Sequence, residues 1–136
     1  MALTISALRN PQLRVLHFLQ AFIYVAILIL ARRNSVWGLG AGVTIGVVWN
    51  SISFFISHLM QAGAVALWSS VRTGHLRGID EMVVLIGSIG HFVLIAACLT
   101  ALFNQTIDKK KWWEFAGGGA LAFAYFALIV AVARPR

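Results

Sequence analysis

Long apolar runs without charged residues constrain this chain more than any other feature of its sequence. Four such runs follow one another, and the short segments around them hold nearly all of the Arg, Lys, Asp and Glu residues. A run of about 20 apolar residues has the length of a helix that crosses a hydrocarbon core of about 30 Å. A helix is favoured there because it satisfies its own backbone hydrogen bonds. The sequence therefore predicts an all-α, polytopic membrane protein, a bundle of four transmembrane helices with short loops.

We expect one integral membrane domain, residues 1–136, whose spans cover residues 13–31, 37–60, 82–103 and 112–133. The second run stays largely uncharged up to Arg72. One helix over all of it would measure about 52 Å, more than the bilayer core needs. The sequence thus leaves two alternatives, a long helix extended to residue 71 or a bend near Gln61–Gly63. Because the loops are short, successive helices are expected to be antiparallel neighbours.

The composition supports membrane residence over a soluble fold. Hydrophobic residues make up 60% of the chain and charged residues 11%, whereas soluble domains have about 25% charged residues. A net charge of +7 would favour nucleic-acid binding in a soluble domain. Here the basic residues flank the apolar runs, which is typical of anchoring to anionic headgroups. The lipid bilayer is therefore the expected partner, and no nucleic acid is expected.

The distribution of basic residues gives little preference for one orientation. With four spans, the side of the termini holds six basic residues and the opposite side five. The six are Arg9, Arg14, Arg72, Arg77, Arg134 and Arg136, and the five are Arg32, Arg33, Lys109, Lys110 and Lys111. The excess of positive charge on the cytoplasmic side of membrane proteins favours cytoplasmic termini by one charge. This balance permits an antiparallel homodimer; the alternative is one orientation set by the first helix or by a partner in a membrane complex.

Small residues in the second and fourth spans predict close helix packing. Gly38, Gly42 and Gly46 recur every four residues, so they share one face of a helix. Such a face lets another helix backbone approach closely. Ala116, Ala120 and Ala124 repeat in the same way in the fourth span. These stripes are the expected contacts within the bundle or within a homo-oligomer.

Polar residues within the second and third spans are the candidate functional residues. The glycine stripe continues through polar side chains, and the third span carries a histidine near its middle. Polar groups in hydrocarbon are unfavourable unless paired, so these side chains should face protein or water. The expected pore or substrate-binding residues are Asn50, Ser53, Ser57, Ser88 and His91. They predict a small oligomeric channel or transporter-like protein for a small ion or neutral solute; simple hydrogen bonding between helices is the structural alternative.

A cofactor-binding subunit is the second functional hypothesis. His17, His58 and His91 lie within or near the spans, and histidine can ligate haem b or hydrogen-bond a quinone. His17 and His58 fall near the same end of their spans. A non-catalytic accessory subunit of a larger membrane complex is a further alternative. The leading hypothesis includes no cofactor. It includes no metal either, because the only cysteine, Cys98, has no zinc-ligand spacing around it.

Enzymatic function finds little support. The sequence holds no Ser-His-Asp order, HExxH, Walker loop or GxGxxG motif. In size and charge balance the chain resembles the small multidrug exporters, but no carboxylate lies deep in any span, and proton-coupled cation export usually needs one. The four-span size and balanced orientation also resemble a fluoride-channel protomer. No motif of either family aligns with this sequence, so no family membership is inferred.

Overall fold

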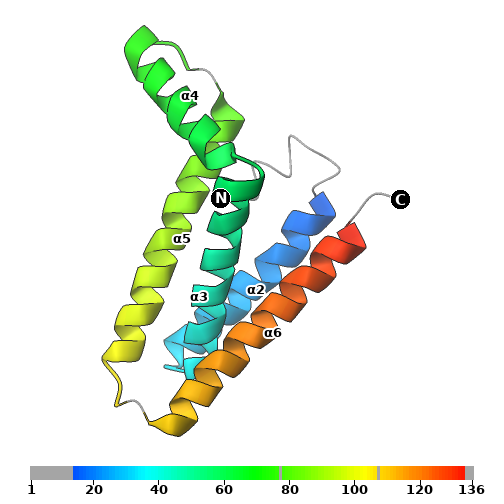
Figure 1. Ribbon diagram of the computed structural model, residues 1–136, viewed down its shortest axis with the longest axis vertical. Helices are drawn as coiled ribbons and strands as arrows, with labels where there is room; N and C mark the ends of the chain where they lie inside the picture. The colour runs from blue at the N-terminus through cyan, green and yellow to red at the C-terminus, as the bar shows by residue number, and fades with distance from the viewer. Residues whose placement is uncertain (1–13, 77, 107, 134–136) are drawn as a thin grey trace.

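The computed structural model describes residues 14–76, 78–106 and 108–133 (Figure 1). These residues form five α-helices and one short π-helical segment, and no strand occurs among them. The prediction of an all-α fold is confirmed. In chain order the elements are α2 (Arg14–Arg32), α3 (Val36–Ser51), η2 (Ile52–Ile56), α4 (Leu59–Thr73), α5 (Ile79–Phe103) and α6 (Lys109–Ala133).

Three helical stretches are long and apolar enough to cross a membrane: Val36–Ile56, Ile79–Phe103 and Lys109–Val132. They correspond to the second, third and fourth predicted spans. The described apolar part of α2, Phe18–Arg32, is shorter than a full span. The described residues thus contain three helices apolar enough to span a membrane, as expected of a membrane protein. The count of four spans stays a prediction, because the start of the first predicted span lies outside the described residues.

Helix α3 lies at the centre of the bundle and contacts α2, α5 and α6. α5 and α6 follow each other in the chain, yet they diverge from the loop that joins them, on either side of α3 (Figure 1). The expectation that successive helices are neighbours therefore fails for this pair. The reason is that α3 offers a smooth surface on two sides and separates the two helices.

Glycines of α3 let the neighbouring helices approach closely on both of these sides. A Cβ atom on Gly42 would lie 2.7 Å from Cys98 Sγ, and one on Gly46 would lie 2.7 Å from Ile95 Cγ1, both in α5. Gly40 follows Gly38 by two residues, which is a rotation of about 200° around the helix axis, so Gly40 lies on nearly the opposite side of α3. A Cβ atom there would collide with the backbone carbonyl of Phe115 in α6. Small residues thus set the separation of α3 from α5 and from α6.

The long second run does not form one helix. α3 widens into η2, and the helix breaks at Ser57 and His58, where His58 has a left-handed backbone with φ 54°. The break thus precedes the bend expected near Gln61–Gly63. Side chains capture carbonyls freed by the wider turn: Gln61 Nε2 donates to Phe54 O at 2.7 Å, and Ser57 Oγ donates to Ile52 O at 3.2 Å. π-Helical turns of this kind often mark functional sites.

α4 starts after the break and packs against the beginning of α5, beyond the end of α3 (Figure 1). Gly63 faces the carbonyl of Glu81, and a Cβ atom on Gly63 would also lie 2.8 Å from Leu85 Cβ. The small residues of α4 therefore face α5. The opposite side presents large apolar side chains such as Trp68, which is 70% exposed.

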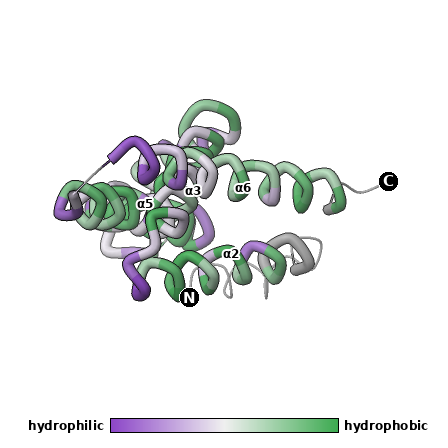
Figure 2. Tube along the Cα trace, turned by 90° about the horizontal axis from the view of Figure 1, so that it is seen from below, coloured by the Kyte–Doolittle hydropathy of each residue, from purple (hydrophilic) through white to green (hydrophobic). Residues whose placement is uncertain are grey.

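Apolar side chains cover much of the outer surface of the bundle. Hydrophobic residues run along most of α2, α5 and α6 (Figure 2), and large outward side chains include Phe92, Leu128 and Val132. Such extensive apolar exposure is unfavourable in water and is expected where the surroundings are lipid. The hydrophobic core is correspondingly small and consists of two clusters, one where α2, α3 and α6 meet and one between α3 and α5.

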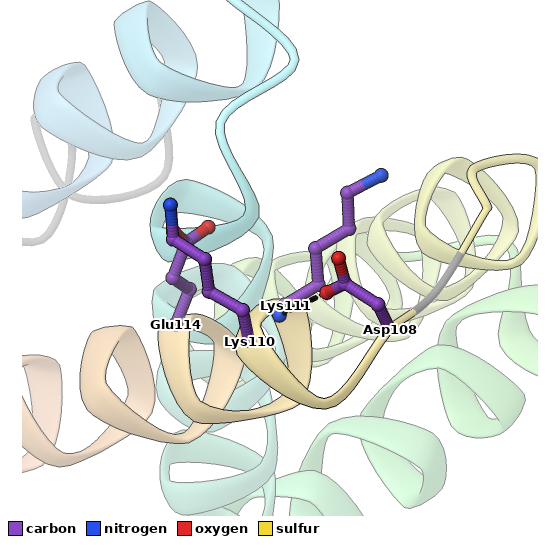
Figure 3. Close-up of polar contacts among 4 residues, drawn as sticks. All are labelled: Asp108, Lys110, Lys111 and Glu114. Carbon is purple, nitrogen blue, oxygen red and sulfur yellow. Dashed lines mark hydrogen bonds and ion pairs between the residues drawn. The ribbon is translucent and has the colours of Figure 1, made fainter.

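Charged residues gather at the start of α6. Asp108 precedes this helix and accepts a hydrogen bond from the backbone N–H of Lys111 at 2.8 Å, while Lys110 Nζ lies 3.9 Å from Glu114 Oε1 (Figure 3). Trp112 and Trp113 follow directly and are exposed. Tryptophan rings beside lysines are typical of the headgroup level of a membrane. This end of the span is therefore expected to lie at the interface.

The close approach at Gly40 yields a stability prediction. Gly40→Ala should lower the free energy of unfolding by about 1–3 kcal/mol, because the new Cβ would push α6 away from α3. Thermal or denaturant unfolding in detergent measures the effect. Gly90→Ala is the matched control, because a Cβ there meets nothing within 4 Å and helix propensity then favours alanine. Equal behaviour of the two variants would contradict the proposed contact.

Candidate functional site

Six polar side chains from three helices gather inside the bundle and are named here the inner polar cluster. They come from α2, from the α3–η2 segment and from α5. Four of them are buried, at most 6% exposed, and Tyr24 and His91 are partly buried at the cluster's centre. The members are Gln20, Tyr24, Asn50, Ser53, Ser88 and His91.

A hydrogen bond between α2 and α5 lies at the centre of the cluster. Tyr24 Oη and His91 Nε2 are 2.5 Å apart, although 67 positions separate the two residues in the chain. The tyrosine donates when the proton of the neutral imidazole is on Nδ1, and the imidazole donates when it is on Nε2. The Trp49 ring lies beside the imidazole, with centroids 6.0 Å apart. The His91 ring is therefore held from two sides.

Helix geometry brings the other members to this centre. Gly42 meets Cys98, and Gly46 meets Ile95 and the His91 carbonyl, so α3 and α5 run antiparallel. One further turn along α3 places Asn50 at the level of Ser88, which is about one turn before His91 on α5. Gln20 lies one turn before Tyr24 on the same side of α2.

Several buried atoms of the cluster have no hydrogen-bond partner among the described residues. They are Gln20 Oε1, both amide atoms of Asn50, Ser88 Oγ and His91 Nδ1. A buried polar group without a partner is unfavourable by about 1–3 kcal/mol, so proteins retain few of them. Their concentration at one place is typical of a site that binds water or a polar ligand.

The cluster is uncharged when His91 is neutral. Its members offer amide, hydroxyl and imidazole groups, which donate and accept hydrogen bonds. The four acidic residues of the chain lie elsewhere: Asp80 and Glu81 in the first turn of α5, and Asp108 and Glu114 around the start of α6. A bare ion would receive little compensation for its lost hydration here, whereas a neutral solute with several hydrogen-bonding groups fits this chemistry.

Four of the five expected pore or binding residues belong to the cluster: Asn50, Ser53, Ser88 and His91. Ser57 does not, because it is exposed at the helix break and donates to Ile52 O. Gln20 and Tyr24 were not among the binding residues expected from the sequence. Their four-residue spacing was the available signal, but the pairing of Tyr24 with His91 depends on tertiary contacts.

The histidines of the haem hypothesis are spread over different places. His58 is exposed at the helix break, and His91 bonds Tyr24 within the cluster. His17 belongs to the first turn of α2, and its side chain lies outside the described part of the structure. In the described ranges, no group of three or more His, Cys, Asp or Glu side chains is arranged to hold a metal ion.

The two small-residue stripes lie in different environments. Gly38, Gly42 and Gly46 are buried against α2 and α5. Ala116, Ala120 and Ala124 are exposed on α6, and the adjacent segment Gly117–Gly119 instead contacts α3 through Trp37 and Thr44. The alanine stripe is thus available to another helix or to lipid.

Comparison with protein-family models, with curated proteins and with solved structures finds no match for this chain. The inner polar cluster is therefore the feature of this chain that bears most directly on its function.

A double-mutant cycle tests the Tyr24–His91 hydrogen bond. Tyr24→Phe and His91→Phe should show a coupling energy of about 1 kcal/mol in unfolding experiments, because either change removes the same bond. Tyr125→Phe with His91→Phe is the control cycle, since Tyr125 Oη donates to Leu19 O at 2.8 Å instead. Additive effects of Tyr24→Phe and His91→Phe would contradict the bond.

A second prediction concerns the unpaired amide of Asn50. Asn50→Leu should leave the unfolding temperature unchanged or raise it, because it replaces two unsatisfied buried atoms with apolar ones of similar size. Ser51→Leu, at the adjacent exposed position, should change the free energy of unfolding by less than about 0.5 kcal/mol. Marked destabilisation by Asn50→Leu alone would mean that the amide has structural partners.

Proposed function

We propose that this protein is a small channel or transporter-like membrane protein that passes a neutral, hydrogen-bonding solute. The observation that supports it is the group of unpaired buried atoms in the inner polar cluster. A solute that leaves water loses its hydrogen bonds, and the cluster offers replacements within the apolar bundle. Asn50 and Ser88 would bind the solute, and His91, held by Tyr24, would orient it or gate its passage.

The position of the cluster favours passage between α3 and α5. Its members on these helices lie beside the glycine contacts and close to the π-helical segment, where the backbone departs from regular α-helix. Irregular backbone inside membrane proteins occurs chiefly where it is buried in protein or lines a water-filled cavity. A change in the α3–η2 segment would therefore alter the cluster directly.

A homo-oligomer remains part of the proposal, with an antiparallel dimer as one form. The exposed stripe of Ala116, Ala120 and Ala124 offers a surface on which a second helix can pack closely. The native mass of the detergent-purified protein tests this assembly, and a heterologous chain bound in its place would favour the accessory-subunit alternative.

The second candidate is a quinone- or haem-binding subunit of a membrane complex. The supporting observation is the partly buried Tyr24–His91 pair beside the Trp49 ring, since a quinone accepts hydrogen bonds and stacks on aromatic rings. A haem would use His17, His58 or His91 as axial ligands. A Soret band in the visible spectrum would identify haem, and solvent extraction would identify a quinone.

Solute flux into proteoliposomes tests the leading proposal. Swelling in glycerol or urea should exceed that of empty liposomes and should fall at least about tenfold with Asn50→Leu, equivalent to losing about one hydrogen bond to the solute. Ser51→Leu is the matched control, because it lies at the same depth but outside the cluster. Absence of swelling, or equal swelling with both variants, would contradict the proposal.

A further inference from the structure

An apolar groove of about 600 Å³ runs between α2 and α6, on the face of the bundle away from the contact of α3 with α5. Phe22, Ala26 and Leu30 line one side, Leu121 and Tyr125 line the other, and Ala41 of α3 forms part of the floor. The residues of the floor, Ala41, Gly118 and Ala122, are small and leave space between the two helices. This groove is separate from the residues of the inner polar cluster.

The groove has the dimensions and surface of a binding site for an alkyl chain. From Leu30 to Phe22 it follows α2 for about 12 Å. Its rim is exposed, with Phe22 at 55% and Leu121 at 67%, and its lining is almost wholly apolar. Because α6 is a candidate membrane span, the molecules that surround this groove are lipids. An acyl chain is the apolar group that lipids supply.

At the end nearest the turn between α2 and α3, the surroundings of the groove change from apolar to polar and basic. Ser35 and Trp37 line it where α2 turns into α3, and Arg32 and Arg33 are exposed at the same turn. Neither arginine forms an ion pair within the described ranges. Two unpaired guanidinium groups complement a phosphate, and tryptophan is enriched at the headgroup level. The apolar groove is thus continuous with a basic end.

We propose that this groove binds one acyl chain of an anionic phospholipid, whose phosphate lies against Arg32 and Arg33. The lipid would fill the space between α2 and α6 and would bridge the two helices. The charge complementarity at the basic end favours an anionic lipid over a zwitterionic one. The apolar groove together with this basic end favours a lipid over a second copy of the chain.

Native mass spectrometry of the full chain in detergent tests the proposal, with phosphatidylglycerol and phosphatidylcholine of identical acyl chains as probes. The wild type should bind phosphatidylglycerol about tenfold more tightly, because both arginines contact a phosphate whose charge is uncompensated, whereas the choline cation of phosphatidylcholine repels them. Ala26→Trp should fill the groove and weaken the binding of both lipids. Ala26→Leu provides a milder change should the larger side chain impair folding, and Ala97→Trp, at an exposed position of α5, is the control.

The basic end is tested separately. Arg32→Gln/Arg33→Gln should remove the preference for phosphatidylglycerol, whereas Arg72→Gln, at the end of α4, should retain it. Equal binding of the two lipids by the wild type would overturn the proposal, and so would unchanged binding by both Ala26 variants. A dimer that dissociates in Ala26→Trp, without any phosphatidylglycerol bound to the wild type, would show that a second copy occupies the groove and would also overturn it.

Discussion

The close approach of helix backbones along α3 is the contact on which the rest of the structure depends. Gly42 and Gly46 admit α5 on one side, and Gly40 admits α6 on another. Association of helices in lipid gains little from the hydrophobic effect, so dispersion between closely packed surfaces must supply much of the attraction. The bundle is consequently organised around its smallest side chains, while large apolar residues face outward.

This organisation explains where the polar residues are. A central helix that contacts three others shields its own polar side chains from lipid. Asn50 lies near the end of such a helix, and Ser53 lies in the η2 segment that continues it. The same glycine contacts bring Ser88 and His91 of α5 close to the level of Asn50. The unpaired atoms of the inner polar cluster belong to α2, α3 and α5, and those of α5 lie within about one helical turn of each other. A site that tolerates unsatisfied groups for function is a common compromise between stability and activity.

The helical fold and several site residues were predictable, whereas their pairing was not. The length of the uncharged apolar runs identified the helices, and the four-residue spacing of the glycines identified the face with Gly42 and Gly46. Gly40 carried no such signal, because it lies off that stripe, so the position of α6 required the tertiary structure. The break at His58 was predicted too late in the sequence, since neither Gly nor Pro marks it. The Tyr24–His91 bond joins residues far apart in the chain, and no local pattern encodes such a bond.

The π-helical segment determines how the chain passes from α3 into α4. A π-turn accommodates one more residue than an α-turn, so η2 behaves as a single-residue insertion retained within a helix. The extra residue shifts by one position the point at which the chain leaves the helix, at Ser57 and His58. α4 begins directly after this break, and Gly63 in its second turn faces the carbonyl of Glu81 in α5. The number of residues in η2 therefore matters for the packing of α4 on α5 as much as their identity does.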